Sequence, residues 1–245
     1  MITRRIWVMT LFPEFFQPLL ACGVAGQALR GERAQEIKFD LRLVNIRDWG
    51  VGNYHAVDDT PYGGGPGMIM RADVLAKAFH EGVMTPGGYT DKSELTVVYT
   101  SPRGLPWDNV HARDFGMKTL TDKDVVFICG RYEGIDERFI DRYVNLTYSL
   151  GDYVLTGGEL AVMTMLDSSV RFVPGILGNK SSANDDSFED GLLECPQYTK
   201  PREFEGVEVP EILSGGHHAN ILKWQQQQKE KMTQTLRPDL WAKRR

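Results

Sequence analysis

Three glycine-containing loop segments constrain the fold of this chain most strongly, because each directly follows an apolar run of strand type. They span residues 99–104, 130–134 and 151–160. Glycine is favoured where a backbone turns sharply or lies close to a ligand. One such segment alone is most often an ordinary strand-to-helix turn. Since three of them follow successive predicted strands, and open α/β proteins bind ligands at strand ends, we expect them to form a single site.

Strand-like and helix-like segments alternate along most of the chain. Short apolar or alternating runs predict strands at 6–11, 39–46, 95–100, 125–129 and 143–150. Helical patterns predict a helix that opens at Pro13, and further helices at 71–82, 107–116, 136–142 and 160–170. This alternation predicts an α/β fold with a mostly parallel sheet.

Two segments between these elements lack periodicity. Residues 47–67 include four glycines and a proline within 63–67, and a loop of this length is usually functional or disordered. Its Asp, His and Tyr content is compatible with a mobile binding loop or with a linker. Residues 83–93 are polar and contain glycine and proline, which predicts a surface loop.

The composition is typical of a soluble globular protein and excludes several function classes. The 245 residues carry a net charge of −5, so the whole chain is not a simple basic nucleic-acid binder. The three cysteines are far apart, which argues against a disulfide framework or a zinc site. The N-terminal apolar run is too short for a secretion signal, and no segment reaches the ~18 apolar residues of a membrane span. We therefore expect a cytoplasmic protein without a membrane partner.

The C-terminal part differs from the rest in charge. Residues 179–193 are rich in Ser, Asn, Asp and Glu, which is typical of a flexible linker or of a loop that orders on binding. A helix is predicted at 217–235, and residues 217–245 hold seven Lys or Arg against two acidic residues. This excess indicates either a solvated helix face or a surface that contacts phosphates.

The glycine-containing loops carry little positive charge, and no Gly-x-Gly-x-x-Gly segment opens a helix. Such loops suit a ligand that is recognised by backbone groups, as adenosyl groups are. A sulfonium cation would in addition favour nearby carboxylates and aromatic faces. Glu133, Asp152, Tyr132 and Tyr153 supply both types of group.

Several motifs resemble those of the bacterial tRNA (guanine-N1)-methyltransferases, and they occur in the order of that family. The likeness runs from the first predicted strand to the C-terminal helix, and it rests on the segments 61–68, 129–138, 151–160, 186–188, 195–199 and 218–219. That family methylates N1 of the guanosine immediately 3′ of the anticodon, at position 37 of tRNA.

The resemblance implies a methyltransferase domain with a deep trefoil knot at 1–177, a flexible linker at 178–194 and a small helical tRNA-binding domain at 195–245. It also implies a homodimer, S-adenosylmethionine as methyl donor, a requirement for Mg²⁺, and the tRNA anticodon stem-loop as partner. His217, His218 and Lys223 are candidate contacts to the RNA, with an ordinary surface role as the alternative.

By position, the resemblance assigns the cofactor to a set of residues in the three loop segments: Tyr99, Thr100, Ser101, Pro102, Gly130, Tyr132, Glu133, Leu150, Gly151, Asp152, Tyr153, Val154, Leu155, Gly157 and Gly158. It assigns Asp186 as general base and Arg171 as its assistant at the guanine. Guanine N1 must lose its proton before it becomes nucleophilic, and a positioned carboxylate can remove that proton. An arginine can stabilise the charge that then develops on the purine.

Two other readings stay open. One is a knotted methyltransferase that acts on another RNA nucleotide or on ribose, for which Asp186 would matter little. The other is a non-catalytic RNA-binding protein with a vestigial cofactor site.

Overall fold

The computed structural model describes residues 1–33, 36–177 and 186–243. The chain divides into two compact units, Met1–Gly178 and Asn179–Arg245, and each is described by itself. Of the predicted linker at 178–194, residues 178–185 lie outside the described residues. Residues 186–194 form turns in the second unit.

The first unit is built on a five-stranded sheet in which every strand pair is parallel, in the order β2-β1-β6-β5-β7. The predicted mostly parallel α/β sheet is therefore confirmed. These five strands are β1 (Ile2–Thr10), β2 (Ile37–Asn45), β5 (Leu95–Pro106), β6 (Asp124–Ile128) and β7 (Leu146–Ser149). A separate short hairpin pairs β3 (Asp58–Asp59) with β4 (Ile69–Met70).

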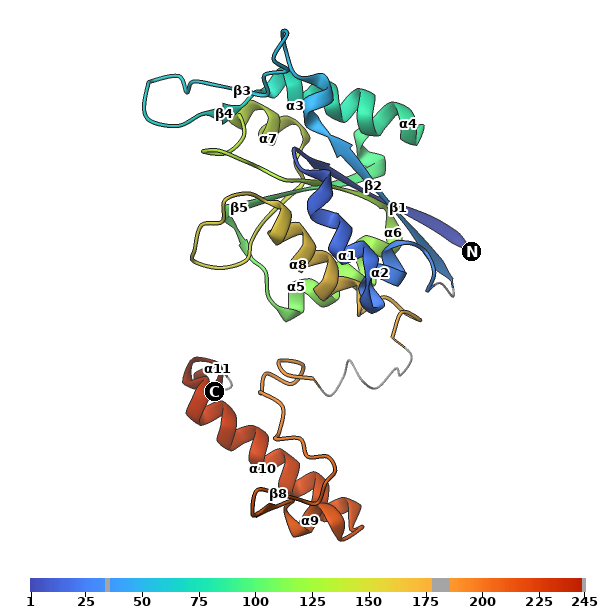
Figure 1. Cartoon of the computed structure of the whole chain (residues 1–245), viewed down its shortest axis with the longest axis vertical. Coiled ribbons are helices and arrows are strands. Elements are labelled where there is room, and N and C mark those ends of the chain that lie inside the picture. The colour runs from blue at the N-terminus through green and yellow to red at the C-terminus, as the bar shows by residue number, and fades with distance from the viewer. Residues whose placement is uncertain (34–35, 178–185, 244–245) are drawn as a thin grey trace. The chain divides into compact units, whose positions relative to one another are not determined.

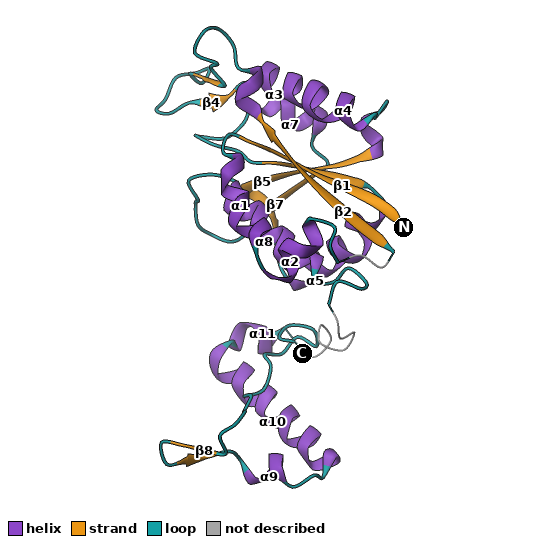
Figure 2. Cartoon of the chain, turned by 45° about the vertical axis from the view of Figure 1, so that its right-hand side comes forward, coloured by secondary structure: helices purple, strands orange, loops and turns teal. Residues whose placement is uncertain are grey.

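Helices cover both faces of the sheet (Figure 2). One face carries α3 (Ala72–Phe79) and α7 (Glu137–Tyr143). The other carries α1 (Gln17–Ala21), α2 (Gly23–Leu29) and α8 (Glu159–Val170). The remaining helices of the unit are α4 (Thr85–Gly87), α5 (Asn109–Asp114) and α6 (Leu120–Asp122).

Side chains of the central strands alternate between the two hydrophobic cores. In β1, Trp7 and Met9 pack under α3 and α7, whereas Ile6 and Val8 pack under α8. This explains why the strands read as continuous apolar runs, since both faces are buried. The strand ends are thereby held rigidly, which is what a site built on loops at those ends requires.

The predicted surface loop at 83–93 is wrong in its first half. The chain continues from α3 through a π-helical turn, His80–Met84, into α4, and Val83 is fully buried. Tyr89 then packs edge-on against Trp7 with the ring centroids 6.5 Å apart. Glycine and proline misled the prediction, because Pro86 lies in the first turn of α4, where its missing N–H costs least.

Strand β5 is longer than predicted. Instead of ending at Thr100, it continues through the Ser-Pro segment, and its pairing with β7 resumes at Leu105 and Pro106 after a register shift. Gly104 is required inside this irregular stretch, because a Cβ there would lie 2.5 Å from the backbone of Tyr148. The predicted loop is therefore an irregularity within a strand pair.

The second unit is mainly helical, and the expected long helix is confirmed as α10 (His218–Leu236). Figure 1 shows it as the longest helix of the chain. The unit also contains α9 (Glu211–Ser214), α11 (Pro238–Ala242) and a small hairpin of β8 (Glu203–Phe204) and β9 (Val207–Glu208). Among the described residues, no helix is long and apolar enough to cross a membrane.

Candidate active site

A cavity of about 190 Å³ is lined by the loops that follow β6 and β7 and by the irregular stretch of β5, which lies between these two strands in the sheet. The three glycine-containing segments form its walls, as expected for ligand sites of open α/β sheets. Thirteen of the fifteen predicted cofactor residues line it: Tyr99, Thr100, Ser101, Pro102, Gly130, Tyr132, Glu133, Leu150, Tyr153, Val154, Leu155, Gly157 and Gly158. Segments more than 50 residues apart in sequence thus meet at one point.

The walls are packed so closely that some positions admit only glycine. A Cβ on Gly158 would lie 2.5 Å from Thr100 Oγ1 and 2.8 Å from Cys129 Cα. A Cβ on Gly130 would lie 2.9 Å from the ring of Tyr99. The N–H of Gly158 donates to the carbonyl of Gly130 over 2.9 Å. These contacts hold the 130–134 and 151–158 loops against each other and against the end of β5.

Thr100 offers a polar group that the described chain leaves unused. Its Oγ1 is buried and has no hydrogen-bond partner among the described residues. A buried hydroxyl without a partner is costly, and native structures contain few of them, so Thr100 is a candidate to bond a ligand or a water molecule. Beside it, burial raises the pKa of Tyr99 and keeps its hydroxyl neutral. The cavity is thus equipped to bind a polar ligand through neutral groups.

Tyr132 adopts a strained backbone conformation in the cavity wall. Its φ is +57°, a left-handed value that is uncommon for a residue other than glycine. Burial and the nearby Asp58 carboxylate raise the pKa of its hydroxyl. Such strain clusters at functional sites.

The end of the 47–67 loop, at Gly67, and the residues directly after it also contact this wall. The N–H of Glu133 donates to the carbonyl of Met68, and that of Met70 donates to the carbonyl of Gly134. A Cβ on Gly67 would lie 2.4 Å from the Glu133 side chain. Of the two interpretations of this loop, these contacts favour the binding loop over the linker.

Six residues of the lining were not predicted: Arg131, Gly134, Tyr148, Ser149, Thr156 and Ala161. Four of them lie within or directly beside the predicted segments, so a reading of whole loops would have included them. Tyr148 and Ser149 end β7, and the rule that ligands bind at carboxyl ends of strands could have found them.

The other predicted site residues lie elsewhere. Gly151 and Asp152 are in the same loop but do not line the cavity. Arg171 directly follows α8, and its guanidinium lies 5.6 Å from the centroid of the Phe172 ring. Asp186 belongs to the second unit, where its carbonyl accepts from the N–H of Glu189. Because Arg171 and Asp186 belong to different units, their joint action at the base stays a prediction.

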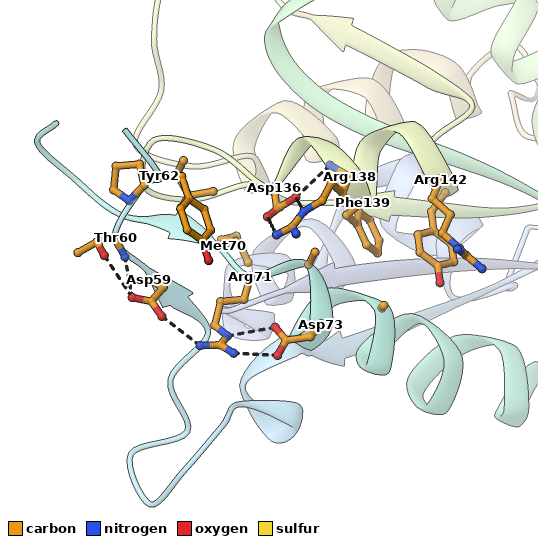
Figure 3. Close-up of a pocket in the computed structure, with 15 residues that line it drawn as sticks. Asp59, Thr60, Tyr62, Met70, Arg71, Asp73, Asp136, Arg138, Phe139 and Arg142 are labelled. Atoms are coloured by element: carbon orange, nitrogen blue, oxygen red, sulfur yellow. Dashed lines mark hydrogen bonds and ion pairs between the residues drawn. The ribbon is translucent and has the colours of Figure 1, made fainter. Parts of the chain in front are cut away.

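A larger groove of about 720 Å³ lies beside the β3–β4 hairpin and α7 (Figure 3). Two of its three arginines are paired with carboxylates of the same wall, and the third, Arg142, lies over the ring of Tyr143. Arg71 pairs with Asp59 and Asp73 at 3.1 and 2.8 Å, and Arg138 pairs with Asp136 at 2.7 Å. The groove therefore presents balanced charge, and the chemistry expected of an adenosyl site lies in the smaller cavity.

Among the described residues, no group of three or more His, Cys, Asp or Glu side chains is arranged to hold a metal ion. The described side chains therefore do not by themselves form a site for the expected Mg²⁺.

Comparison with known proteins identifies the family of the chain. The family model "tRNA (Guanine-1)-methyltransferase TrmD" matches residues 4–243. A tRNA (guanine-N(1)-)-methyltransferase of Bartonella bacilliformis is 44% identical over 98% of this chain and 96% of its own length. Proteins of the same name from Ruegeria sp. and Burkholderia ambifaria are 43% and 45% identical, over 96% and 97% of this chain and 91% and 86% of their own lengths.

The resemblance drawn from the sequence motifs is thereby confirmed. The matches cover both the unit that holds the cavity and the helical second unit. The chain belongs to the TrmD family of tRNA (guanine-N1)-methyltransferases.

Proposed function

We propose that this enzyme transfers a methyl group from S-adenosylmethionine to N1 of the guanosine immediately 3′ of the anticodon, at position 37 of tRNA. The observation that carries the proposal is the convergence of the three glycine-containing segments on one cavity, which also holds the buried hydroxyl of Thr100. Membership of the family supplies the reaction class.

The residues present fit S-adenosylmethionine, which supplies an electrophilic methyl group on a sulfonium centre. Thr100 Oγ1 and the closely packed glycine backbones suit the polar edges of an adenosyl group. Tyr132, Tyr153 and Glu133 provide aromatic faces and a carboxylate that favour a cation. The cavity is smaller than the ~300–1,000 Å³ of typical ligand sites. We therefore expect the exposed wall at Tyr153 and Val154 to move outward as the cofactor binds.

Asp186 is the proposed general base that removes the proton from guanine N1. Removal of this proton makes N1 nucleophilic, and the base must then lie in line with the methyl group. Arg171 would stabilise the negative charge that develops at O6 of the purine. The target base must leave its stack to reach both groups.

The second unit, from about residue 195, is proposed to hold the anticodon stem-loop. The basic excess of its C-terminal part supports this role, since RNA stems are bound largely through phosphates. The homodimer, the trefoil knot and the Mg²⁺ requirement belong to the same proposal, and all three rest on the family. No step of the reaction is assigned to Mg²⁺.

The decisive experiment is incubation of the full chain with methyl-labelled S-adenosylmethionine and unmodified tRNA that carries guanosine at position 37. Nucleoside analysis should then find the label in 1-methylguanosine. The same tRNA with adenosine at position 37 is the matched control and should stay unlabelled. Label on ribose or on another nucleotide would support the alternative methyltransferase. A folded chain that binds the cofactor but labels no RNA would support the non-catalytic alternative.

A further inference from the structure

A buried ion pair joins two walls of the cofactor cavity. Arg131 lines the cavity, and its Nη2 lies 2.9 Å from Oε2 of Glu159, whose side chain is only 1% exposed. Glu159 is the first residue of α8, and its Oε1 accepts a hydrogen bond of 2.8 Å from Thr10 at the end of β1. The Arg131 side chain is therefore fixed to the sheet and to α8.

The same guanidinium also holds the loop that precedes α8. Its Nη1 donates to the carbonyl of Thr156 over 3.2 Å, and its Nε donates to Glu159 over 3.2 Å. Gly157 lies directly against it, since a Cβ at that position would come within 2.2 Å of Nε. The position of Arg131 thus sets the position of residues 156 and 157, which line the cavity.

Two aromatic rings fix the guanidinium from another side. Its Cζ lies 4.4 Å from the ring centroid of Phe12 and 5.5 Å from that of Phe15. A planar guanidinium can stack on such rings and donate in several directions at once, and a lysine ammonium reproduces only part of this. The environment is therefore specific for arginine.

We propose that Arg131 is a positioning residue that holds the 153–158 wall of the cavity in its cofactor-binding conformation, acting through Glu159, Thr156 and Gly157. This inference rests on the proposed function, because it concerns the affinity for S-adenosylmethionine. A role confined to stability would require only the ion pair, whereas the contact with Gly157 and the bond to Thr156 act on the cavity wall itself.

The test measures binding of S-adenosylmethionine by calorimetry, together with KM and kcat, for the full chain and four variants. They are Arg131→Ala, Arg131→Lys, Gly157→Ala and the double variant Arg131→Ala/Gly157→Ala. Displacement of a positioned group by about 1 Å can slow catalysis roughly 100-fold, and we expect Arg131→Ala to raise the Kd for S-adenosylmethionine by a similar factor, about 100-fold. Arg131→Lys should recover part of the loss, and KM for tRNA should stay unchanged.

Gly157→Ala keeps the ion pair but pushes the loop away from Arg131. We expect it to raise the Kd about tenfold, and this loss should disappear when Arg131 is already alanine, since the obstructing side chain is gone. Arg131→Lys and Gly157→Ala both keep a cation opposite Glu159, so they decide the question even if Arg131→Ala does not fold.

Arg42 is a matched control remote from the cavity. It pairs with Asp40 at 2.7 Å and stacks on Trp7 at 5.1 Å, so Arg42→Met removes a similar set of contacts and should leave the Kd unchanged. Lower Tm with an unchanged Kd in Arg131→Lys and Gly157→Ala would overturn the inference. Failure of the unsubstituted chain to bind S-adenosylmethionine would overturn the proposed function and this inference together.

Discussion

The two units of the chain differ in how much of their structure is buried. The first buries side chains on both faces of a parallel sheet and holds a cavity between rigid strand ends. Among the described residues of the second unit, the buried ones are Leu192, Cys195 and Thr233. A small ligand needs closely packed walls, whereas a large polar partner such as RNA is bound across an exposed surface. On the proposed function, the first unit binds the cofactor and the second binds the RNA.

The largest expected effect concerns Asp186, which connects the two roles. Asp186→Asn removes the proposed base but keeps the shape of the side chain. Positioned proton transfer contributes about 10²- to 10⁴-fold, so we expect kcat for methyl transfer to fall by that factor. Binding of S-adenosylmethionine should stay unchanged, because the cavity belongs to the first unit. Single-turnover kinetics and calorimetry measure the two quantities.

Loss of cofactor binding together with activity in Asp186→Asn would show that the second unit helps to form the cavity, and the division of roles would then fail. An unchanged kcat would instead favour a reaction at ribose, for which this carboxylate matters little.

A second test compares the cores of the two units. Phe127 is fully buried, and its ring centroid lies 5.8 Å from that of Phe115. Phe127→Ala should therefore lower the free energy of unfolding by about 3–5 kcal/mol. Trp224 in α10 is only half-buried, and its ring centroid lies 6.4 Å from that of Tyr198. Trp224→Ala should lower the free energy of unfolding by about 1 kcal/mol. Urea denaturation followed by circular dichroism measures both. Equal losses would mean that the second unit has a core as important as that of the first.

Gly158 tests the packing of the cavity walls. A Cβ at this position would collide with Thr100 and with the backbone of Cys129, and the backbone cannot yield as a flexible side chain can. A shift of about 1 Å can slow catalysis roughly 100-fold, and we expect Gly158→Ala to weaken S-adenosylmethionine binding by a similar factor. Gly215 of the second unit is the matched control, because an added Cβ there would meet only carbonyl oxygens at 3.8 Å or more. Similar affinities for the two variants would contradict the assignment of the cavity.

The sequence alone predicted most of the first unit, because its signals are local. Apolar runs identified the strands, and the loops that follow them marked the cavity. The contact between Arg131 and Glu159 could not be predicted in this way, since the two residues are 28 positions apart and only the tertiary fold brings them together. The prediction of a loop at 83–87 failed for a related reason. The chain is helical there because Val83 is buried against the sheet, and this tertiary contact outweighs local propensity. The roles of Arg171 and Asp186 came from family resemblance alone.

Tyr89 gives a smaller effect that depends on pH. It donates a hydrogen bond to Asp124 and accepts one of 3.1 Å from Trp7, so Tyr89→Phe should cost about 1 kcal/mol at neutral pH. Burial and the bond to Asp124 raise the pKa of Tyr89 in the folded chain. Its contribution is therefore complete below about pH 10, the unfolded pKa, and is lost as pH rises through the raised folded value. Urea denaturation at pH 7 to 11 should show the two curves converging, whereas the exposed Tyr54→Phe should match the parent chain throughout.

The smallest expected effect tests the surface of the second unit. Lys223 is exposed on α10, and Lys223→Ala should weaken tRNA binding a few-fold without changing the affinity for S-adenosylmethionine. If its ammonium contacts a phosphate, the slope of log K against log salt should fall by about one. Lys118 is the control, an exposed lysine of the first unit that pairs with Asp114 at 3.0 Å. A salt slope that changes for Lys118→Ala and not for Lys223→Ala would place the RNA on the first unit, and the comparison between the units would have to be redrawn.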